Sequence, residues 1–151
     1  MARKWPTRPR RKLASADAVD ARAKAEEDER NQWITEARSM ILHAKLPIAE
    51  VAEKSLKPES IWAGIAQGLR ARTLRRRVRD WQKAARFSMM SSGTPWPRDV
   101  ASLLHYMQVL ENGEVPLSAM QNMMFACSFM EKAGGVDKTA HVSSHPWCSR
   151  V

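Results

Sequence analysis

Cysteine and histidine side chains near the carboxyl end of the chain are the residues best suited to bind a metal ion. Cys127, His141, His145 and Cys148 supply two thiols and two imidazoles, and the last three are closely spaced. A structural zinc site takes such ligands in a tetrahedral set that commonly begins with a Cys-x-x-Cys pair. The sequence contains no such pair, and Cys127 lies in an apolar stretch. We therefore expect Cys127 to be a buried structural cysteine, with no metal bound.

Nucleophilic catalysis has no recognisable signature in this sequence. There is no strand-turn-helix motif that would present a serine, and no glycine-rich loop that would bind a phosphate group. A Cys-His or Ser-His pair would have to be assembled by the fold. We expect no enzymatic activity, no cofactor and no small-molecule substrate for this chain.

Basic residues give the clearest chemical signal, because they are concentrated in two short blocks. The chain has 25 Lys and Arg against 16 Asp and Glu, a net charge of +9. Positions 69–86 hold eight basic residues and one acid, Asp80, and positions 1–16 hold six basic residues and no acid. Such concentration suits a polyanionic partner better than a thinly spread excess of charge does.

The second basic block also has helical periodicity. At 100° per residue, Leu74, Val78, Trp81, Ala85 and Ser88 fall within about 40° of one line, as the buried face of an amphipathic helix requires. Six cations share an arc on the outward side, and we call them the basic stripe: Arg72, Arg75, Arg76, Arg79, Lys83 and Arg86.

The signs of these charges argue against an ordinary solvated helix face. Exposed helices usually mix Glu with Lys at i,i+4 spacing, whereas like charges at that spacing cost roughly 0.2–0.5 kcal/mol a pair. Phosphate groups would relieve this repulsion, and arginine suits bidentate contacts to phosphates or to guanine edges. We predict a nucleic-acid partner, with double-stranded DNA preferred and RNA left open.

The elements that must position the stripe are predicted to be helices. Ala, Leu, Met, Arg, Lys and Glu are abundant, and strand-forming residues are scarce, so the fold class is expected to be all-α. Ser15 is a plausible N-cap, Thr73 is expected to cap the helix that carries the stripe, and Gly93 is expected to end that helix in a left-handed conformation. The predicted helices run over residues 15–45, 47–57, 73–92, 97–111 and 116–133, with a frayed segment at 59–69.

A family resemblance is carried by residues between positions 70 and 136. They are Thr73–Trp81, Gly93, Trp96–Asp99, Leu103–Met107 and Phe129–Gly134. This pattern resembles the SAM-like core-binding domain of the tyrosine recombinases, the phage-integrase family. The resemblance implies a small orthogonal helical bundle that clamps one side of a DNA duplex during the DNA recombination and integration of a mobile element.

The catalytic half of that family is not expected in this chain. Family members carry an Arg, a Lys, a His-x-x-Arg motif and a Tyr nucleophile in a separate carboxyl-terminal domain. Here the tail His145–Arg150 lacks the His-x-x-Arg spacing, and Tyr106 falls among Leu103 and Leu110 as a packing residue. The resemblance therefore implies DNA binding without strand cleavage, with catalysis supplied by a separate domain; the alternative partner is a second copy of the chain in a homo-oligomer.

The predicted organisation has four parts. Residues 1–14 form a disordered basic arm, 15–68 a helical amino-terminal extension, 69–136 the core-binding helical domain and 137–151 an irregular tail. The arm offers accessory DNA contacts or a nuclear-import patch, and its alternatives are a solubilising tail or a transit peptide. The arm residues concerned are Arg8, Arg10, Arg11 and Lys12.

A rival hypothesis from another class is a helical module that binds a protein partner. In that case Trp33, Trp62 and methionine-rich surfaces would form the interface, and the arginines would only solubilise the chain. No apolar run approaches the ~20 residues of a membrane span. We expect an intracellular protein, neither secreted nor membrane-bound, that is nuclear or otherwise associated with DNA.

Overall fold

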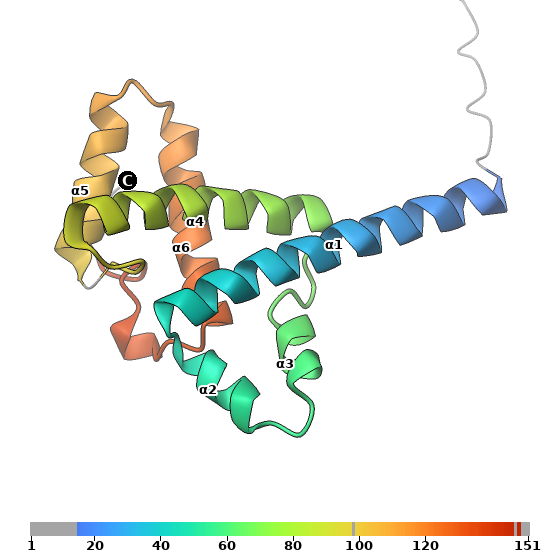
Figure 1. Ribbon diagram of the computed structural model, residues 1–151. Helices are drawn as coiled ribbons and strands as arrows, with labels where there is room; N and C mark the ends of the chain where they lie inside the picture. The colour runs from blue at the N-terminus through green and yellow to red at the C-terminus, as the bar shows by residue number, and fades with distance from the viewer. Residues whose placement is uncertain (1–14, 98, 147, 149–151) are drawn as a thin grey trace, which may run out of the picture.

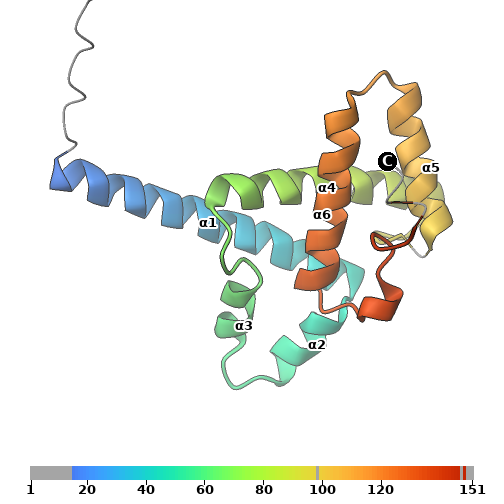
Figure 2. The ribbon, with the colours of Figure 1, turned by 180° about the vertical axis from the view of Figure 1, so that it is seen from behind.

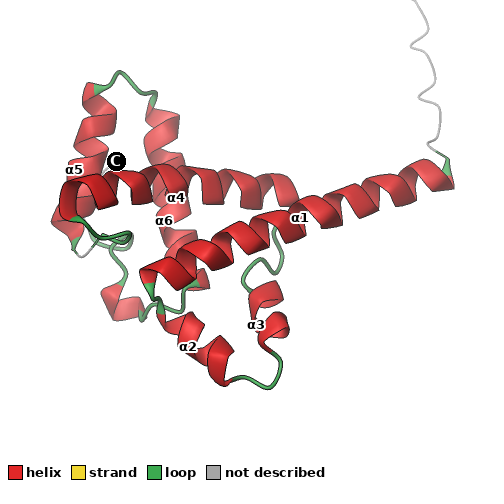
Figure 3. Cartoon of the chain, viewed as in Figure 1, coloured by secondary structure: helices red, strands yellow, loops and turns green. Residues whose placement is uncertain are grey.

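The protein is all-helical, as predicted from its composition. The computed structural model describes residues 15–97, 99–146 and 148, and these residues contain helices and loops but no strand (Figure 3). The elements in chain order are α1 (Ala16–Ala44), α2 (Pro47–Lys54), α3 (Pro58–Gly64), α4 (Ala71–Ser92), α5 (Val100–Asn112), α6 (Leu117–Ala133) and the short 3-10 helix η1 (Lys138–Ala140).

Helix α1 has a solvated first half and a packed second half. Its predicted cap is confirmed, because the Ser15 hydroxyl accepts a hydrogen bond from the Ala18 N–H at 3.3 Å. The first turns are exposed and extend away from the rest of the fold (Figure 1). Burial begins at Trp33 and continues at Ala37 and Ile41, where the sequence first becomes apolar at helical spacing.

Helices α1 and α4 lie side by side and run in the same direction (Figures 1 and 2). Two consecutive helices of a bundle are usually antiparallel when a short loop joins them. Here α2, α3 and the following turns return the chain to the middle of α1, where Ala71 meets Glu26, so α4 can run parallel to the second half of α1. A small core cluster joins the two helices: Trp33, Ala37, Ala66, Leu74 and Val78.

In Figure 2, α6 crosses in front of α4 with α5 beside it, and these three helices supply most of the buried residues of the larger core cluster. Trp81 of α4 is 1 % exposed and packs on Trp96, with ring centroids 4.7 Å apart. Tyr106 is buried, as its predicted packing role requires. Helix α6 is apolar on most of its surface, but Leu117 and Phe125 are 60 % and 55 % exposed, so one of its faces is open.

The end of α6 is held close to the start of α2. The Gly134 carbonyl accepts a hydrogen bond from the Ile48 N–H at 2.9 Å. A Cβ atom at position 134 would overlap the Leu46 side chain and lie 2.9 Å from the Met130 carbonyl oxygen. Glycine is therefore required here by the close approach of two segments that are far apart in the sequence.

Two predicted helix starts are wrong. Helix α4 begins at Ala71, with Arg70 at the cap position, and so Thr73 lies inside its first turn. Helix α5 begins at Val100 and not at Pro97, because the Asp99 carboxylate accepts from the Ser102 N–H at 2.8 Å and sets the start there. The end of α4 is confirmed at Gly93, which has φ of 71°.

Residues on both sides of the boundary predicted near Gly68 contribute to one hydrophobic core. Ile41 and Trp62 belong to the same buried cluster as Trp81 and Leu103. Helix α1 thus holds α4 in place from one side while α5 and α6 hold it from the other.

Candidate nucleic-acid interface

Helix α4 has a buried apolar face that fixes its rotation about its own axis. The buried residues recur at intervals of three and four, and the face they form packs against α1 on one side and α6 on the other. They are Ala71, Leu74, Val78, Trp81, Ala84 and Ser88. Because this face is fixed, the opposite face of α4 must point to solvent.

Five of the six members of the basic stripe are exposed on that opposite face. Their positions follow one another at intervals of four, three, four and three residues, which places them along a single line on a helix. At 1.5 Å per residue this line is about 21 Å long. The five exposed members are Arg72, Arg76, Arg79, Lys83 and Arg86.

Arg75, the sixth member, points to α1 instead. Its Nη1 atom lies 2.8 Å from Oε1 of Glu29, and the two side chains are 40 % and 32 % exposed. A half-exposed ion pair of this kind contributes about 0–1 kcal/mol to stability. Sequence reasoning placed Arg75 on the outward arc but did not identify Glu29, because nothing in the sequence shows which helix lies beside α4.

Carboxylates of α1 border the stripe along one edge. Glu26 accepts a hydrogen bond from the Ala71 N–H at 2.8 Å, at the amino end of α4, and Glu36 accepts from Gln82 Nε2 at 3.4 Å. The positive end of the α4 dipole also carries cations, which is unfavourable, and the Glu26 carboxylate offsets part of that cost. The outward face of α4 is therefore basic, and its α1 edge is acidic.

Two guanidinium groups of α4 rest on aromatic rings. Arg79 Cζ lies 5.2 Å from the Trp33 ring centroid, and Arg77 Cζ lies 4.6 Å from that of Phe125. Burial lowers the pKa of Arg77, and repulsion from Arg76 lowers it further, although arginine remains a cation at neutral pH. These contacts hold long side chains in place, which reduces the entropy lost when a ligand binds.

The four arm residues predicted to make accessory contacts, at positions 8, 10, 11 and 12, lie outside the described residues. Within the described part of the chain, the ion pairs closer than 4.0 Å are Arg75–Glu29 and Arg38–Glu59. Neither involves the five exposed stripe members.

The four residues considered as zinc ligands do not form a metal site in the part of the chain that the structure describes. Cys127 and Cys148 are both buried, and burial raises the pKa of each thiol, with a further contribution from the nearby Glu131. A ring nitrogen of His141 lies 2.8 Å from the Val136 carbonyl oxygen. Among the residues that the structure describes, no group of three or more His, Cys, Asp or Glu side chains is arranged to hold a metal ion.

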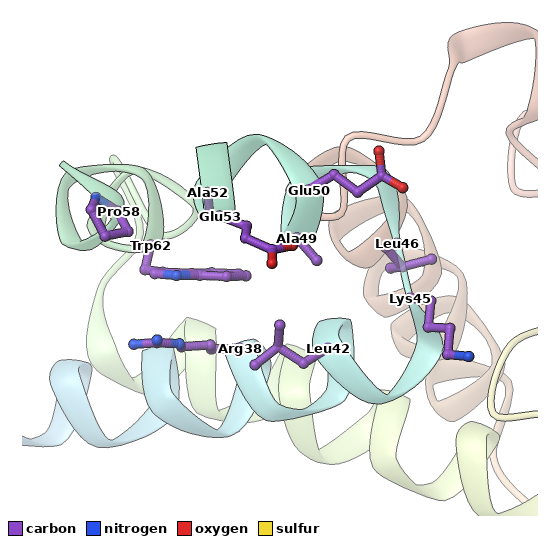
Figure 4. A pocket seen from close by; sticks show the side chains of 10 residues that line it. All are labelled: Arg38, Leu42, Lys45, Leu46, Ala49, Glu50, Ala52, Glu53, Pro58 and Trp62. Carbon is purple, nitrogen blue, oxygen red and sulfur yellow. The ribbon is translucent and has the colours of Figure 1, made fainter. Parts of the chain in front are cut away.

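A cavity of about 580 Å³ opens between α1, α2 and α3 (Figure 4). The Trp62 ring forms one wall, with Arg38 facing it 5.1 Å from the ring centroid. Trp33 and Trp62 are only 9 % and 3 % exposed, so their rings are core residues and not the open partner surface of the rival hypothesis. The residues that line the cavity are Arg38, Leu42, Lys45, Leu46, Ala49, Glu50, Ala52, Glu53, Pro58 and Trp62.

This chain matches no family model, no curated protein and no solved structure. None of the helices described has the length and apolar composition needed to cross a membrane.

Proposed function

We propose that this chain is a DNA-binding module, without catalytic activity of its own, that lays the outward face of α4 along the phosphate backbone of a duplex. The observation that carries the proposal is the line of five exposed cations between Arg72 and Arg86, which α1 and α6 hold outward by burying the opposite face of α4. Like charges at this spacing repel one another, and phosphates relieve that repulsion.

The resemblance to recombinase core-binding domains extends the proposal. The module would clamp DNA for a recombinase-like reaction, and a separate domain would supply the strand-cleaving groups. The burial of Tyr106 supports the assignment of strand cleavage to a separate domain. This side chain is 9 % exposed, and desolvation raises the pKa of its hydroxyl. A buried phenol with a raised pKa is a poor nucleophile. The basic residues at positions 8–12 would add contacts beyond α4, and such a protein would act where DNA is found in the cell.

A salt titration of duplex binding tests the proposal. Five phosphate contacts give a slope of about −4.5 in a plot of log Kobs against log salt, or roughly a 500-fold loss of affinity between about 50 and 200 mM. We expect Arg76→Gln with Lys83→Gln to weaken binding and to reduce the slope by about 1.8. Fluorescence anisotropy with a labelled duplex gives both quantities.

The matched control is Lys54→Gln with Lys57→Gln, which removes the same charge from two exposed positions, one at the end of α2 and one just before α3. It should leave the slope unchanged. Equal slopes for the two double variants would rule out a specific role of the stripe. A binding partner that responds weakly to salt would favour the rival protein-interaction module, and a preference for single strands or RNA over duplex DNA would exclude the duplex.

A further inference from the structure

Arg75 differs from the other stripe members in having a carboxylate partner. Arg72 and Arg76, the stripe members that precede and follow it in the sequence, are exposed, whereas Arg75 is turned aside to Glu29 at 2.8 Å. A phosphate that reached Arg75 would approach the Glu29 carboxylate at the same time. Two anions at one guanidinium edge repel, so the phosphate and Glu29 must compete for Arg75.

Glu29 cannot easily move away, because α1 is anchored on both sides of it. One turn before, Glu26 accepts a hydrogen bond from the first N–H of α4 at 2.8 Å. One turn after, Trp33 is buried against Leu74 and Val78 and lies beneath the Arg79 guanidinium. Glu29 therefore remains beside Arg75 as long as α1 and α4 stay packed.

We propose that the Glu29 carboxylate competes with DNA phosphates for the Arg75 guanidinium. Glu29 thereby prevents Arg75 from binding the phosphate backbone and sets the edge of the surface that the polyanion covers. This inference depends on the proposed function. The bound duplex then contacts the five exposed stripe members and stops before the Arg75–Glu29 ion pair. Removing the Glu29 charge adds Arg75 as a sixth contact.

The experiment compares the salt dependence of duplex binding for Glu29→Gln and Glu27→Gln. Both substitutions remove one negative charge from α1, but Glu27 is exposed and its loss releases no arginine of the stripe. Glu29→Gln should make the slope steeper by about 0.9, so that the loss of affinity between about 50 and 200 mM salt grows about 3.5-fold. Glu27→Gln should raise affinity slightly through net charge and leave the slope at its original value.

Arginine variants complete the test. Arg75→Gln alone should leave the slope of the unmodified protein unchanged, whereas Arg76→Gln should reduce it by about 0.9. Adding Arg75→Gln to Glu29→Gln should cancel the gain. Melting curves establish that each variant is folded.

The outcomes separate the two proposals. If the unmodified protein binds DNA with a steep salt dependence but Glu29→Gln behaves like Glu27→Gln, the competitor role is overturned and the proposed function stands. If Arg75→Gln reduces the slope as much as Arg76→Gln does, Arg75 is an ordinary contact, and the competitor role is again overturned. If the unmodified protein shows no salt-dependent binding, both proposals fail.

Discussion

At the scale of single residues, Glu131 shows how one buried carboxylate can organise a loop. Its side chain is 1 % exposed, and Oε1 accepts hydrogen bonds from the Val142 N–H at 2.6 Å and the Ser143 N–H at 3.2 Å. The Ser143 hydroxyl donates to Oε2. Backbone donors that are taken out of water must find acceptors, and a charged acceptor is stronger than a neutral one. Glu131 thus fixes the segment after η1 against α6.

We expect Glu131→Ala to lower the free energy of unfolding by about 3 kcal/mol, since each hydrogen bond to a charged group contributes about 1.5–3 kcal/mol and the donors would lose their acceptor. Chemical denaturation measures the change. Glu111→Ala, at an exposed position on α5, is the control and should stay within about 0.5 kcal/mol of the unmodified protein. A similar small effect at position 131 would contradict this account.

At the scale of elements, the pairing of α1 with α4 depends on contacts between residues about 46 positions apart. Glu26 meets Ala71, Glu29 meets Arg75 and Glu36 meets Gln82. The parallel arrangement keeps this offset nearly constant, because both helices advance by the same rise per residue. Helix α4 has no side-chain cap of its own at Arg70, so its first turn relies on a carboxylate from α1.

Glu26→Ala should therefore destabilise the protein by about 1 kcal/mol, the usual effect of losing a helix cap. Glu27→Ala is the matched control, because it makes the same substitution one residue further along α1 without touching α4. Thermal or urea unfolding compares the two. Equal stabilities would show that the Glu26 carboxylate does not act as a cap in solution.

At the scale of the whole molecule, the excess of positive charge lowers the stability of the folded state. The chain has a net charge of +9, and the exposed stripe concentrates several of its cations on one helix face. Self-repulsion of this kind destabilises the compact state, although it also draws in a polyanion. The same charges that favour binding therefore lower the stability of the unbound protein.

Salt should consequently act in opposite directions on folding and on binding. Raising sodium chloride from about 50 to about 500 mM shortens the Debye length below 10 Å, so it should raise the melting temperature of the unbound protein while it weakens duplex binding. Arg76→Gln with Lys83→Gln removes part of the repulsion, and its melting temperature should rise less with salt. A melting temperature that falls with salt would mean that favourable ion pairs outweigh the repulsion.

Local interactions made a large part of this protein predictable from its sequence. The spacing of Leu74, Val78 and Trp81 correctly indicated the buried face of α4, and five of the six cations predicted to face outward are exposed there, Arg75 being the exception. The Ser15 cap and the left-handed Gly93 were also predicted correctly. Each of these features is determined by residues within a few positions of one another, where helical geometry leaves little choice.

Only the tertiary structure decided which carboxylates lie beside the stripe. The sequence shows an acidic run from Glu26 to Glu29 but not that it lies along α4, since the direction in which two helices pack depends on the path of the chain between them. The same holds for the start of α4, where a cap from Glu26 took the place of the predicted Thr73. The sequence determined that α4 is basic outward; the packing of α1 determined where that basic surface ends.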